Sequence, residues 1–346
     1  MSSSIKQLEL GGDSVEGDIQ NIPIIDLFAL NSRNSQDRQN LAEQVYKACT
    51  QVGFFYIKNH GISKELIAAL HEEARLFFAL PEEQKMEYYV GKSKKYRGYM
   101  PLYTEQPTGI DEPDPATQPT TGAFSESFDI GYELSADPER TVDDVLPPDI
   151  YSLYGENQWP SDSILFDFQK TYLTYFREAL SLSRKLMRVF ALALDMEEDF
   201  FDPMMKYPGV ASRMLHYPPQ PVEGEADYEC FTILSQDNVP ALQVRNKQGE
   251  WILAPPIPGT MVVNIADCLS IWTNRKFKST IHRVANMTGQ ERYSIPFFFG
   301  VDYNTTVSVL ENCISDERPA CKEPFKAGEF VRAQLAKAYV GYSGEA

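Results

Sequence analysis

The chain lacks the features that mark several common classes of protein. Its 346 residues contain no run of roughly eighteen or more apolar residues, the length that a membrane-spanning helix requires. Positive charge is also scarce, because 32 Lys and Arg face 49 Asp and Glu, for a formal net charge of −17. A protein so acidic repels phosphate backbones and anionic membrane surfaces. We therefore expect neither a nucleic-acid partner nor a membrane partner.

Cysteine is sparse and shows no recognisable spacing. The five cysteines form an odd number without a Cys-x-x-Cys pair, and several stand inside apolar runs. We expect buried thiols rather than disulfides or zinc ligands, which is typical of a reducing compartment. The first residues, Met1 to Lys6, carry neither an apolar signal core nor an Arg-rich leader, so we expect a cytoplasmic protein. Residues 1–21 are polar and rich in Gly and Ser, which predicts a flexible tail.

The part of the chain up to residue 200 alternates helical patterns with short β-rich runs. The segment 100–160 is dense in Pro, Gly, Thr and Asp, and an irregular stretch of that length predicts a functional loop, here a candidate lid. Residues 162–195 carry apolar residues at seven-residue spacing from Phe166 to Leu194, with Asp162 or Ser163 as the expected N-cap. The other expected elements are a strand at 22–27, a helix at 35–51, a strand at 52–58, a helix at 63–78 and a helix start at Pro81.

From residue 211 the pattern changes to short β runs separated by turns containing Pro and Gly. About eight runs at this spacing predict a jelly roll or barrel, whose mouth is a natural ligand pocket. The expected fold class is mainly β with helices (α+β), a double-stranded β-helix core backed by N-terminal and central helices. The expected organisation is a helical N-terminal region with flanking strands at 22–200, a jelly-roll core at 208–305, and a C-terminal extension at 306–346 with a helix near 327–339.

Histidine is the scarcest residue with metal-binding chemistry, since the chain has four. An oxygen-activating Fe(II) site typically uses two imidazoles and one carboxylate on one face and leaves positions open for substrate and O₂. Asp227 and His282 lie 55 residues apart in the β-rich part, and the residue two before Asp227 is Glu225. The sequence therefore offers one imidazole and two carboxylates for such a site.

An Arg-x-Ser pair follows His282 at a distance of ten residues. Arg292 and Ser294 share one face of a strand, and the guanidinium fork of arginine can hold a carboxylate in two parallel hydrogen bonds. Tyr217 can donate its phenol to the same anion from an earlier strand. This pattern predicts a site for the distal carboxylate of a dicarboxylic acid.

Taken together, these residues resemble the iron(II)/2-oxoglutarate-dependent dioxygenases, in the branch that includes isopenicillin N synthase and the plant-type oxidases of secondary metabolism. The resemblance covers almost the whole chain after the tail. The segments that carry it are Ile22–Leu27, Gly53–Gly61, Glu126–Gly131, His216–Pro219, Leu242–Arg245, Gly249–Trp251, Pro256–Gly259, His282–Val284 and Arg292–Phe298.

The resemblance implies a function and a set of site residues. It implies Asp227 and His282 as iron ligands, and Arg292, Ser294 and Tyr217 as ligands of 2-oxoglutarate. The cofactors would be Fe(II), 2-oxoglutarate as co-substrate and O₂, and the oxidation of 2-oxoglutarate to succinate and CO₂ would drive hydroxylation, desaturation or cyclisation of a small organic metabolite. Alternatives are an oxidase that works without 2-oxoglutarate, as isopenicillin N synthase does, and a non-catalytic jelly-roll binding or partner protein.

The chain departs from the family pattern at one iron ligand. Glu225 occupies the position of the first histidine, and the connection from His216 to Asp227 is shorter than the family's. Three interpretations stay open. Glu225 is an oxygen ligand of a changed metal site, or it is a solvated loop residue beside a weak or absent iron site, or the sequence reflects a shortened gene model or splice form.

Substrate residues have weaker signals. Arg97 lies in a short basic island, Lys94 to Arg97, of an acidic chain, and it could meet an acidic substrate. Phe297 and Phe299 lie on the strand that begins at Arg292, where alternate residues can line the substrate space. Of the histidines other than His282, His216 precedes Tyr217 on a strand, so alternation sends it to the opposite face.

Overall fold

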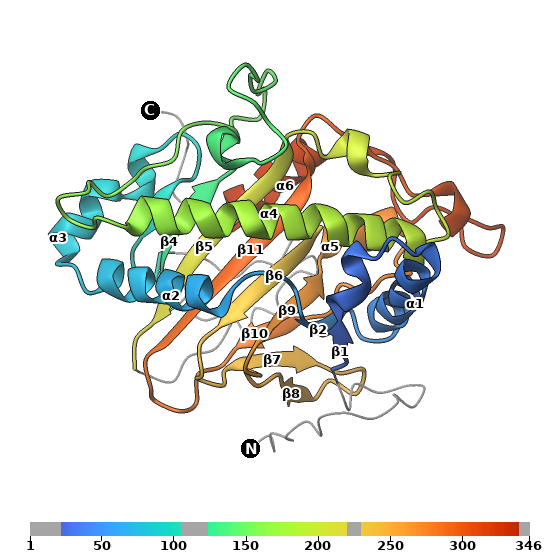
Figure 1. The fold of residues 1–346 in the computed structure, drawn as a ribbon, viewed down its shortest axis with the longest axis horizontal. Coiled ribbons are helices and arrows are strands. Elements are labelled where there is room, and N and C mark those ends of the chain that lie inside the picture. Colours follow the sequence, from blue (N-terminus) through green and yellow to red (C-terminus); the bar gives the residue numbers. More distant parts are fainter. Residues whose placement is uncertain (1–21, 105–123, 220–229, 339–346) are drawn as a thin grey trace.

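The computed structural model describes residues 22–104, 124–219 and 230–338. In these ranges a large β-sheet has helices on one face and a small β-sheet on the other (Figure 1). The two sheets share a buried apolar cluster that includes Phe54, Leu234 and Val262 of the large sheet and Leu242 and Val244 of the small one.

The large sheet draws strands from both halves of the chain. Its middle strands come from residues after 200, while strands that precede residue 200 form both of its edges. Adjacent strands are antiparallel except for the first pair, which is parallel. The strand order is β1 (Ile24–Asp26), β2 (Phe54–Lys58), β9 (Thr260–Ile265), β6 (Phe231–Gln236), β11 (Arg292–Asp302), β5 (Pro208–Tyr217), β4 (Glu126–Gly131) and β3 (Gly98–Met100). The small sheet has the order β10 (His282–Val284), β7 (Leu242–Arg245) and β8 (Trp251–Leu253), and a separate pair is formed by β12 (Thr306–Val307) and β13 (Phe325–Lys326).

Several helices begin where the sequence predicts them. Asn34 and Ser63 are N-caps whose side chains accept hydrogen bonds from the backbone N–H groups of Gln36 and Leu66, which satisfies donors that the first turn leaves free. The helices are α1 (Ser35–Gln51), α2 (Lys64–Phe78), α3 (Glu82–Lys85), α4 (Phe168–Ala193), α5 (Asp267–Trp272) and α6 (Ala327–Ala338). In Figure 1, α2 and α4 run side by side across one face of the large sheet.

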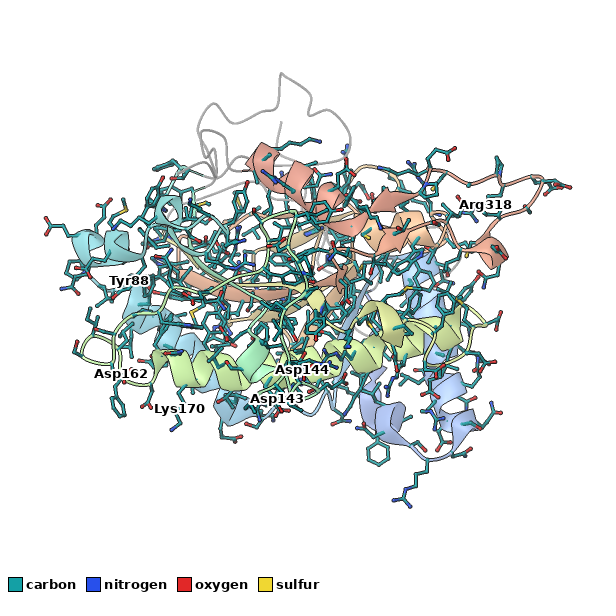
Figure 2. The ribbon with its side chains drawn as sticks, turned by 90° about the horizontal axis from the view of Figure 1, so that it is seen from above. Tyr88, Asp143, Asp144, Asp162, Lys170 and Arg318 are labelled. Atoms are coloured by element: carbon teal, nitrogen blue, oxygen red, sulfur yellow. The ribbon has the colours of Figure 1, made fainter. Side chains whose placement is uncertain are left out.

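The start of the longest helix was predicted wrongly. The sequence pattern places the N-cap at Asp162 or Ser163, but α4 begins at Phe168. The backbone N–H groups of Ile164 and Leu165 instead donate to the carbonyl of Ser161 and close a separate turn. Phe166, the first residue of the predicted apolar stripe, lies outside the helix and is 76% exposed. Asp162, on this turn, lies at the periphery of the molecule (Figure 2).

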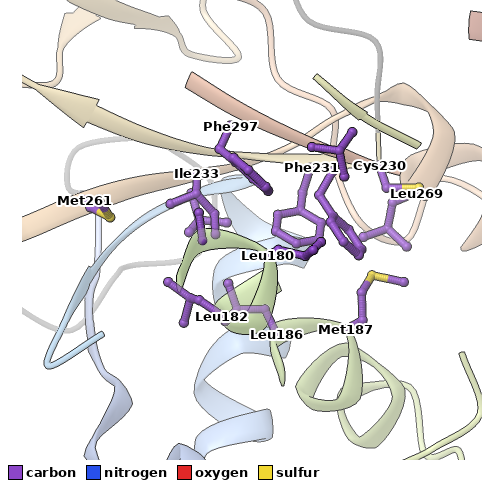
Figure 3. Close-up of a cluster of buried hydrophobic side chains, with 14 of the residues drawn as sticks. Leu180, Leu182, Leu186, Met187, Cys230, Phe231, Ile233, Met261, Leu269 and Phe297 are labelled. Carbon is purple, nitrogen blue, oxygen red and sulfur yellow. The ribbon is translucent and has the colours of Figure 1, made fainter. Parts of the chain in front are cut away.

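Alternation along the strands gives the large sheet two distinct faces. On the helix-side face, Phe231, Ile233 and Phe297 belong to the main core and meet Leu180 and other residues of α4 (Figure 3). On the opposite face, here called the inner face, apolar residues of both sheets form two smaller clusters, one of which consists of Leu215, Tyr217, Ala241 and Val284. The functional candidates divide between these two faces.

Among the residues that the structure describes, no helix is long and apolar enough to cross a membrane. All five cysteines are free thiols, as predicted, and Cys321 differs from the prediction of burial because it is exposed.

Candidate active site

Arg292 and Ser294 lie on the inner face of the large sheet. The register of β11 and β5 pairs Arg292 with Tyr217 and Ser294 with Leu215, and both partners belong to the inner apolar cluster. On its other side, β11 pairs Ser294 with Gln236 of β6. Three adjacent strands thus bring Tyr217, Arg292, Ser294 and Gln236 to one place.

The guanidinium of Arg292 is buried, and its hydrogen-bond partners among the described residues are neutral. The residue is fully buried, its Nη1 donates to Ser294 Oγ at 3.1 Å, and its Nη2 donates to Gln236 Oε1 at 3.3 Å. The guanidinium carbon lies 5.0 Å from the centre of the Tyr217 ring. In the described ranges, Nε has no hydrogen-bond partner and no carboxylate forms an ion pair with Arg292. Because burial of a charge is costly unless an opposite charge compensates it, this arrangement fits a bound carboxylate.

Two titratable side chains, His71 and Asp237, lie near Arg292, and neither forms an ion pair with it. Burial, and then the positive charges of Arg75 and Arg292, lower the pKa of His71 to about 4, so its imidazole is neutral near pH 7. His71 Nε2 lies 2.9 Å from Ser235 Oγ, on the helix-side face beside Gln236. Both carboxylate oxygens of Asp237 accept hydrogen bonds from the backbone, one from Tyr293 N–H at 2.5 Å and the other from Val239 N–H at 2.9 Å. Burial raises the pKa of Asp237, whereas its backbone hydrogen bonds and the positive charges of Arg292 and Arg75 oppose that rise, so Asp237 interacts with the Arg292 charge without forming an ion pair with it.

His282 lies on the inner face, and one of its ring nitrogens contacts the backbone. It opens β10 opposite Val244 of β7, and its ring lies 5.0 Å from that of Phe54 on the inner face. Nδ1 lies 3.1 Å from the backbone carbonyl of Thr280. A carbonyl oxygen only accepts hydrogen bonds, so Nδ1 carries a proton, and the neutral tautomer with this contact has its lone pair on Nε2. Backbone contacts of this kind fix the tautomer of metal-binding histidines.

The remaining candidate metal ligands, Glu225 and Asp227, lie outside the described residues. Within those that are described, no group of three or more His, Cys, Asp or Glu side chains is placed to hold a metal ion. The other histidines have partners away from His282: His60 accepts from Ile62 N–H, His71 meets Ser235, and His216 lies between two carboxylates on the helix-side face. The fit of iron to this chain therefore rests on Nε2 of His282 and on the chemistry of Asp227.

Two of the predicted substrate residues face away from this site. Phe297 and Phe299 are fully buried in the main core, and Phe297 stacks edge-on against Phe176 of α4 at 5.4 Å between ring centres. Figure 3 shows Phe297 pointing toward the α4 side chains. Their prediction as pocket residues therefore conflicts with the packing. Phe298, which lies between them, faces the inner side and is half-buried.

Arg97 is buried and forms hydrogen bonds within the protein. It is 5% exposed, its Nη2 donates to the carbonyl of Leu153 at 2.8 Å, and its Nη1 donates to that of Tyr96 at 3.2 Å. A Cβ built on Gly131 would lie 1.8 Å from Arg97 Nη2, so the guanidinium packs directly on the glycine backbone. These contacts tie the start of β3 to β4 and to the segment around Leu153. They offer no support for the predicted contact with substrate.

Gln236 and Phe298 were not identified from the sequence. Phe298 could have been identified from the sequence, because side chains alternate along a strand and Phe298 therefore lies on the same face as Arg292 and Ser294. Gln236 could not, since its place beside Arg292 depends on the pairing of β6 with β11.

Comparisons with known proteins identify the family of this chain. Residues 22–162 match the model of the non-haem dioxygenase in morphine synthesis N-terminal family, and residues 206–301 match that of the 2OG-Fe(II) oxygenase superfamily. The chain is 32% identical over 339 residues to the 2-oxoglutarate-Fe(II) type oxidoreductase ppzC of Metarhizium rileyi, with 92% of this chain and 87% of the relative covered. It is 33% identical to the homoarginine-6-hydroxylase 2-ODD-C23 of Glycine max, with 85% and 89% covered.

The fold matches that of solved oxygenases. The crystal structure of a full-length Neurospora crassa protein in complex with alpha-KG and thymine superposes with a TM-score of 0.75 at 26% identity, and the match covers 91% of this chain and 96% of that one. The predicted jelly-roll core with helices is confirmed. The chain belongs to the 2OG-Fe(II) oxygenase superfamily, a family of oxidoreductases that use Fe(II), 2-oxoglutarate and O₂.

Proposed function

We propose that Arg292, Ser294 and Tyr217 bind the distal carboxylate of 2-oxoglutarate in this chain. The observation that carries the proposal is the buried guanidinium of Arg292, whose described partners are all neutral. A carboxylate there would supply the missing negative charge and could accept two parallel hydrogen bonds. The Ser294 hydroxyl accepts from Arg292, which leaves its own proton to donate to the same anion. Gln236 orients the guanidinium from the other side.

We assign His282 and Asp227 as the iron ligands that the family pattern locates in this chain. His282 presents Nε2, and its Nδ1 contact with Thr280 holds the ring in that orientation. Bound Fe(II) would supply the activation of O₂. Glu225 stands where the family has its first histidine. A carboxylate there would favour harder metals such as Mn or Mg over Fe.

The substrate is proposed to be a small organic molecule that approaches from the inner face near Phe298. Names among the relatives point to this size class, since one is a homoarginine hydroxylase and the Neurospora crassa protein was crystallised with thymine. The net charge of −17 argues against a nucleic-acid polymer. Five free thiols fit a reducing, cytoplasmic location.

Anaerobic titration with Fe(II) and 2-oxoglutarate tests the proposal directly. We expect 2-oxoglutarate binding by calorimetry, a metal-dependent absorption band, and succinate production once O₂ and a substrate are supplied. Binding without succinate would favour a non-catalytic binding protein. Turnover of a substrate with no succinate would favour an oxidase of the isopenicillin N synthase kind.

Two variants at Glu225 separate the interpretations of the changed ligand. If Glu225 binds the metal, Glu225→Ala weakens metal affinity, whereas a solvated loop residue leaves it unchanged. Glu225→His strengthens Fe(II) binding if the loop can still place an imidazole, although a shortened loop can misplace it by more than a metal site tolerates. Genomic DNA across codons 217–230 shows whether a longer form of the loop exists.

A further inference from the structure

A second charged cluster lies on the helix-side face, directly behind the carboxylate site. The strand register aligns Glu126 of β4 with His216 of β5, and His216 with Tyr293 of β11. This row is one residue away from the pair of Tyr217 and Arg292. Since side chains alternate along a strand, whatever fixes His216 and Tyr293 also fixes the backbone from which Tyr217 and Arg292 project.

His216 lies between two carboxylates. Its Nδ1 lies 2.7 Å from Glu126 Oε1 and its Nε2 lies 2.8 Å from Glu291 Oε1. The ring stacks on Tyr293 with 4.8 Å between centres and 16° between planes, and Phe78 of α2 packs on it at 5.3 Å. The His216 side chain is 10% exposed, while that of Glu291 is 51% exposed.

The geometry offers each ring nitrogen of His216 a carboxylate oxygen as acceptor. A carboxylate oxygen accepts hydrogen bonds, and a neutral imidazole has a single N–H, so two such contacts need the doubly protonated ring. Burial alone would raise the pKa of Glu126, but hydrogen bonds from His216, Lys85 and Tyr99 outweigh it and hold that pKa below its ordinary value. Glu126 is therefore held as an anion.

The surrounding charges balance this cluster. Lys85 Nζ lies 2.6 Å from Glu126 Oε2, and the Tyr99 hydroxyl donates to the same oxygen at 2.6 Å. Arg75 of α2 lies over the Tyr293 ring at 5.6 Å and pairs with Glu72 at 2.9 Å. Two carboxylates, one lysine and one imidazolium thus form a group with no net charge, which lowers the cost of burying it.

We propose that His216 is a positioning residue for the co-substrate: as an imidazolium between Glu126 and Glu291, it locks β5 and β11 in the register that holds Tyr217 beside Arg292. The proposal rests on the proposed role of Arg292 as the 2-oxoglutarate anchor. A neutral side chain at 216 gives up one of the two contacts and loosens the end of β11 at the residue before Arg292. The carboxylate site then loses its alignment without losing any of its own side chains.

Histidine NMR tests the charge state without any ligand. The chain has four histidines, so ¹⁵N-histidine labelling gives a spectrum simple enough to assign with His216→Gln. We expect both ring nitrogens of His216 to be protonated at pH 7. A neutral His216 at that pH would overturn the proposal.

Calorimetric binding of 2-oxoglutarate tests the positioning itself. We expect His216→Gln to weaken binding roughly tenfold, by analogy with the lower end of the losses found when partners of metal-ligating residues are removed, and Glu291→Gln to weaken it by a few-fold. Glu291 is half-exposed, so its variant should fold even if His216→Gln does not. The matched control is Glu317→Gln, an exposed glutamate in a distant loop, which should leave the dissociation constant unchanged.

The outcomes distinguish two failures. Wild-type protein that binds no 2-oxoglutarate overturns the carboxylate site and, with it, the positioning role. If Arg292→Met strongly weakens the binding of 2-oxoglutarate but the His216 and Glu291 variants leave it unchanged, the positioning role alone is overturned.

Discussion

Arg184 and Arg292 are both buried arginines, yet their surroundings are opposite. Arg184 of α4 makes a two-pronged ion pair with Asp137, at 2.6 and 2.7 Å, and it is 5% exposed. Arg292 is fully buried and meets a hydroxyl, an amide oxygen and a phenol ring. One charge is compensated by the fold, and the other, among the described residues, has no carboxylate partner. The difference supports the proposal that Arg292 binds a ligand, whereas Arg184 forms an ion pair within the fold.

Removing the carboxylate from the compensated pair should have the largest effect on stability. Asp137→Ala leaves Arg184 buried, and its remaining ion-pair partner among the described residues is the half-exposed Glu139 at 3.5 Å. We expect a loss of about 3–5 kcal/mol in the free energy of unfolding, the usual cost of stranding a buried charge. Urea denaturation measures it, with the exposed Asp143→Ala as control, expected within about 0.5 kcal/mol of wild type. A loss below about 1 kcal/mol would show that Arg184 does not depend on Asp137.

Removing the uncompensated charge should instead change binding. We expect Arg292→Met to weaken 2-oxoglutarate binding about 100-fold, or roughly 2.7 kcal/mol, because the charge-assisted bonds are lost. The free energy of unfolding should stay equal or rise, since a buried cation is replaced by an apolar side chain. The matched substitution Arg184→Met should lower stability and leave the affinity of the folded protein unchanged. Equal affinities of the Arg292→Met variant and the wild type would refute the carboxylate site.

The sequence contains a local pattern around Arg292 but none that indicates the ion pair of Arg184. Strand alternation and a short Arg-x-Ser spacing are local properties, and from them the sequence predicts that Arg292 and Ser294 share one face of a strand. Their role as carboxylate ligands, together with Tyr217, stays a prediction. The partnership of Arg184 with Asp137 spans 47 residues and depends on how α4 packs, so no local pattern indicates it. The contact of Gln236 with Arg292 has the same origin.

The errors of sequence reasoning have equally specific causes. Phe297 and Phe299 were assigned to the pocket although the parity of Arg292 points to Phe298. Arg97 looked like an exposed cation in a basic island, but backbone carbonyls and the bare face of Gly131 bury it. Charge in the sequence does not reveal whether the folded chain supplies the partner.

A buried acid near the compensated arginine should govern part of the pH dependence of stability. Burial raises the pKa of Asp302 to about 6, although Arg184, Arg140 and Lys206 oppose the shift. The folded state therefore binds more protons than the unfolded state between about pH 4 and 6, so this group lowers stability as pH rises through that window. Asp302→Asn keeps an oxygen that can accept from Tyr207 N–H but does not titrate. We expect its advantage over wild type to grow by on the order of 2 kcal/mol from pH 4 to pH 7, measured by urea denaturation.

The smallest expected effect is a change in the pKa of His71, which responds to the positive charge of Arg292. The pKa of His71 is lowered to about 4 by burial first and then by Arg75 and Arg292, so its neutral form supports stability that is lost as pH falls from 6.5 toward 4. A bound carboxylate should offset the field of Arg292 and raise the pKa of His71 by roughly 0.3–0.5 unit, readable by histidine NMR. Arg292→Met should produce a similar rise without ligand, and 2-oxoglutarate should then add nothing. A ligand-induced shift that persists in Arg292→Met would mean that the anion binds elsewhere, and the contrast between the two arginines would no longer identify the site.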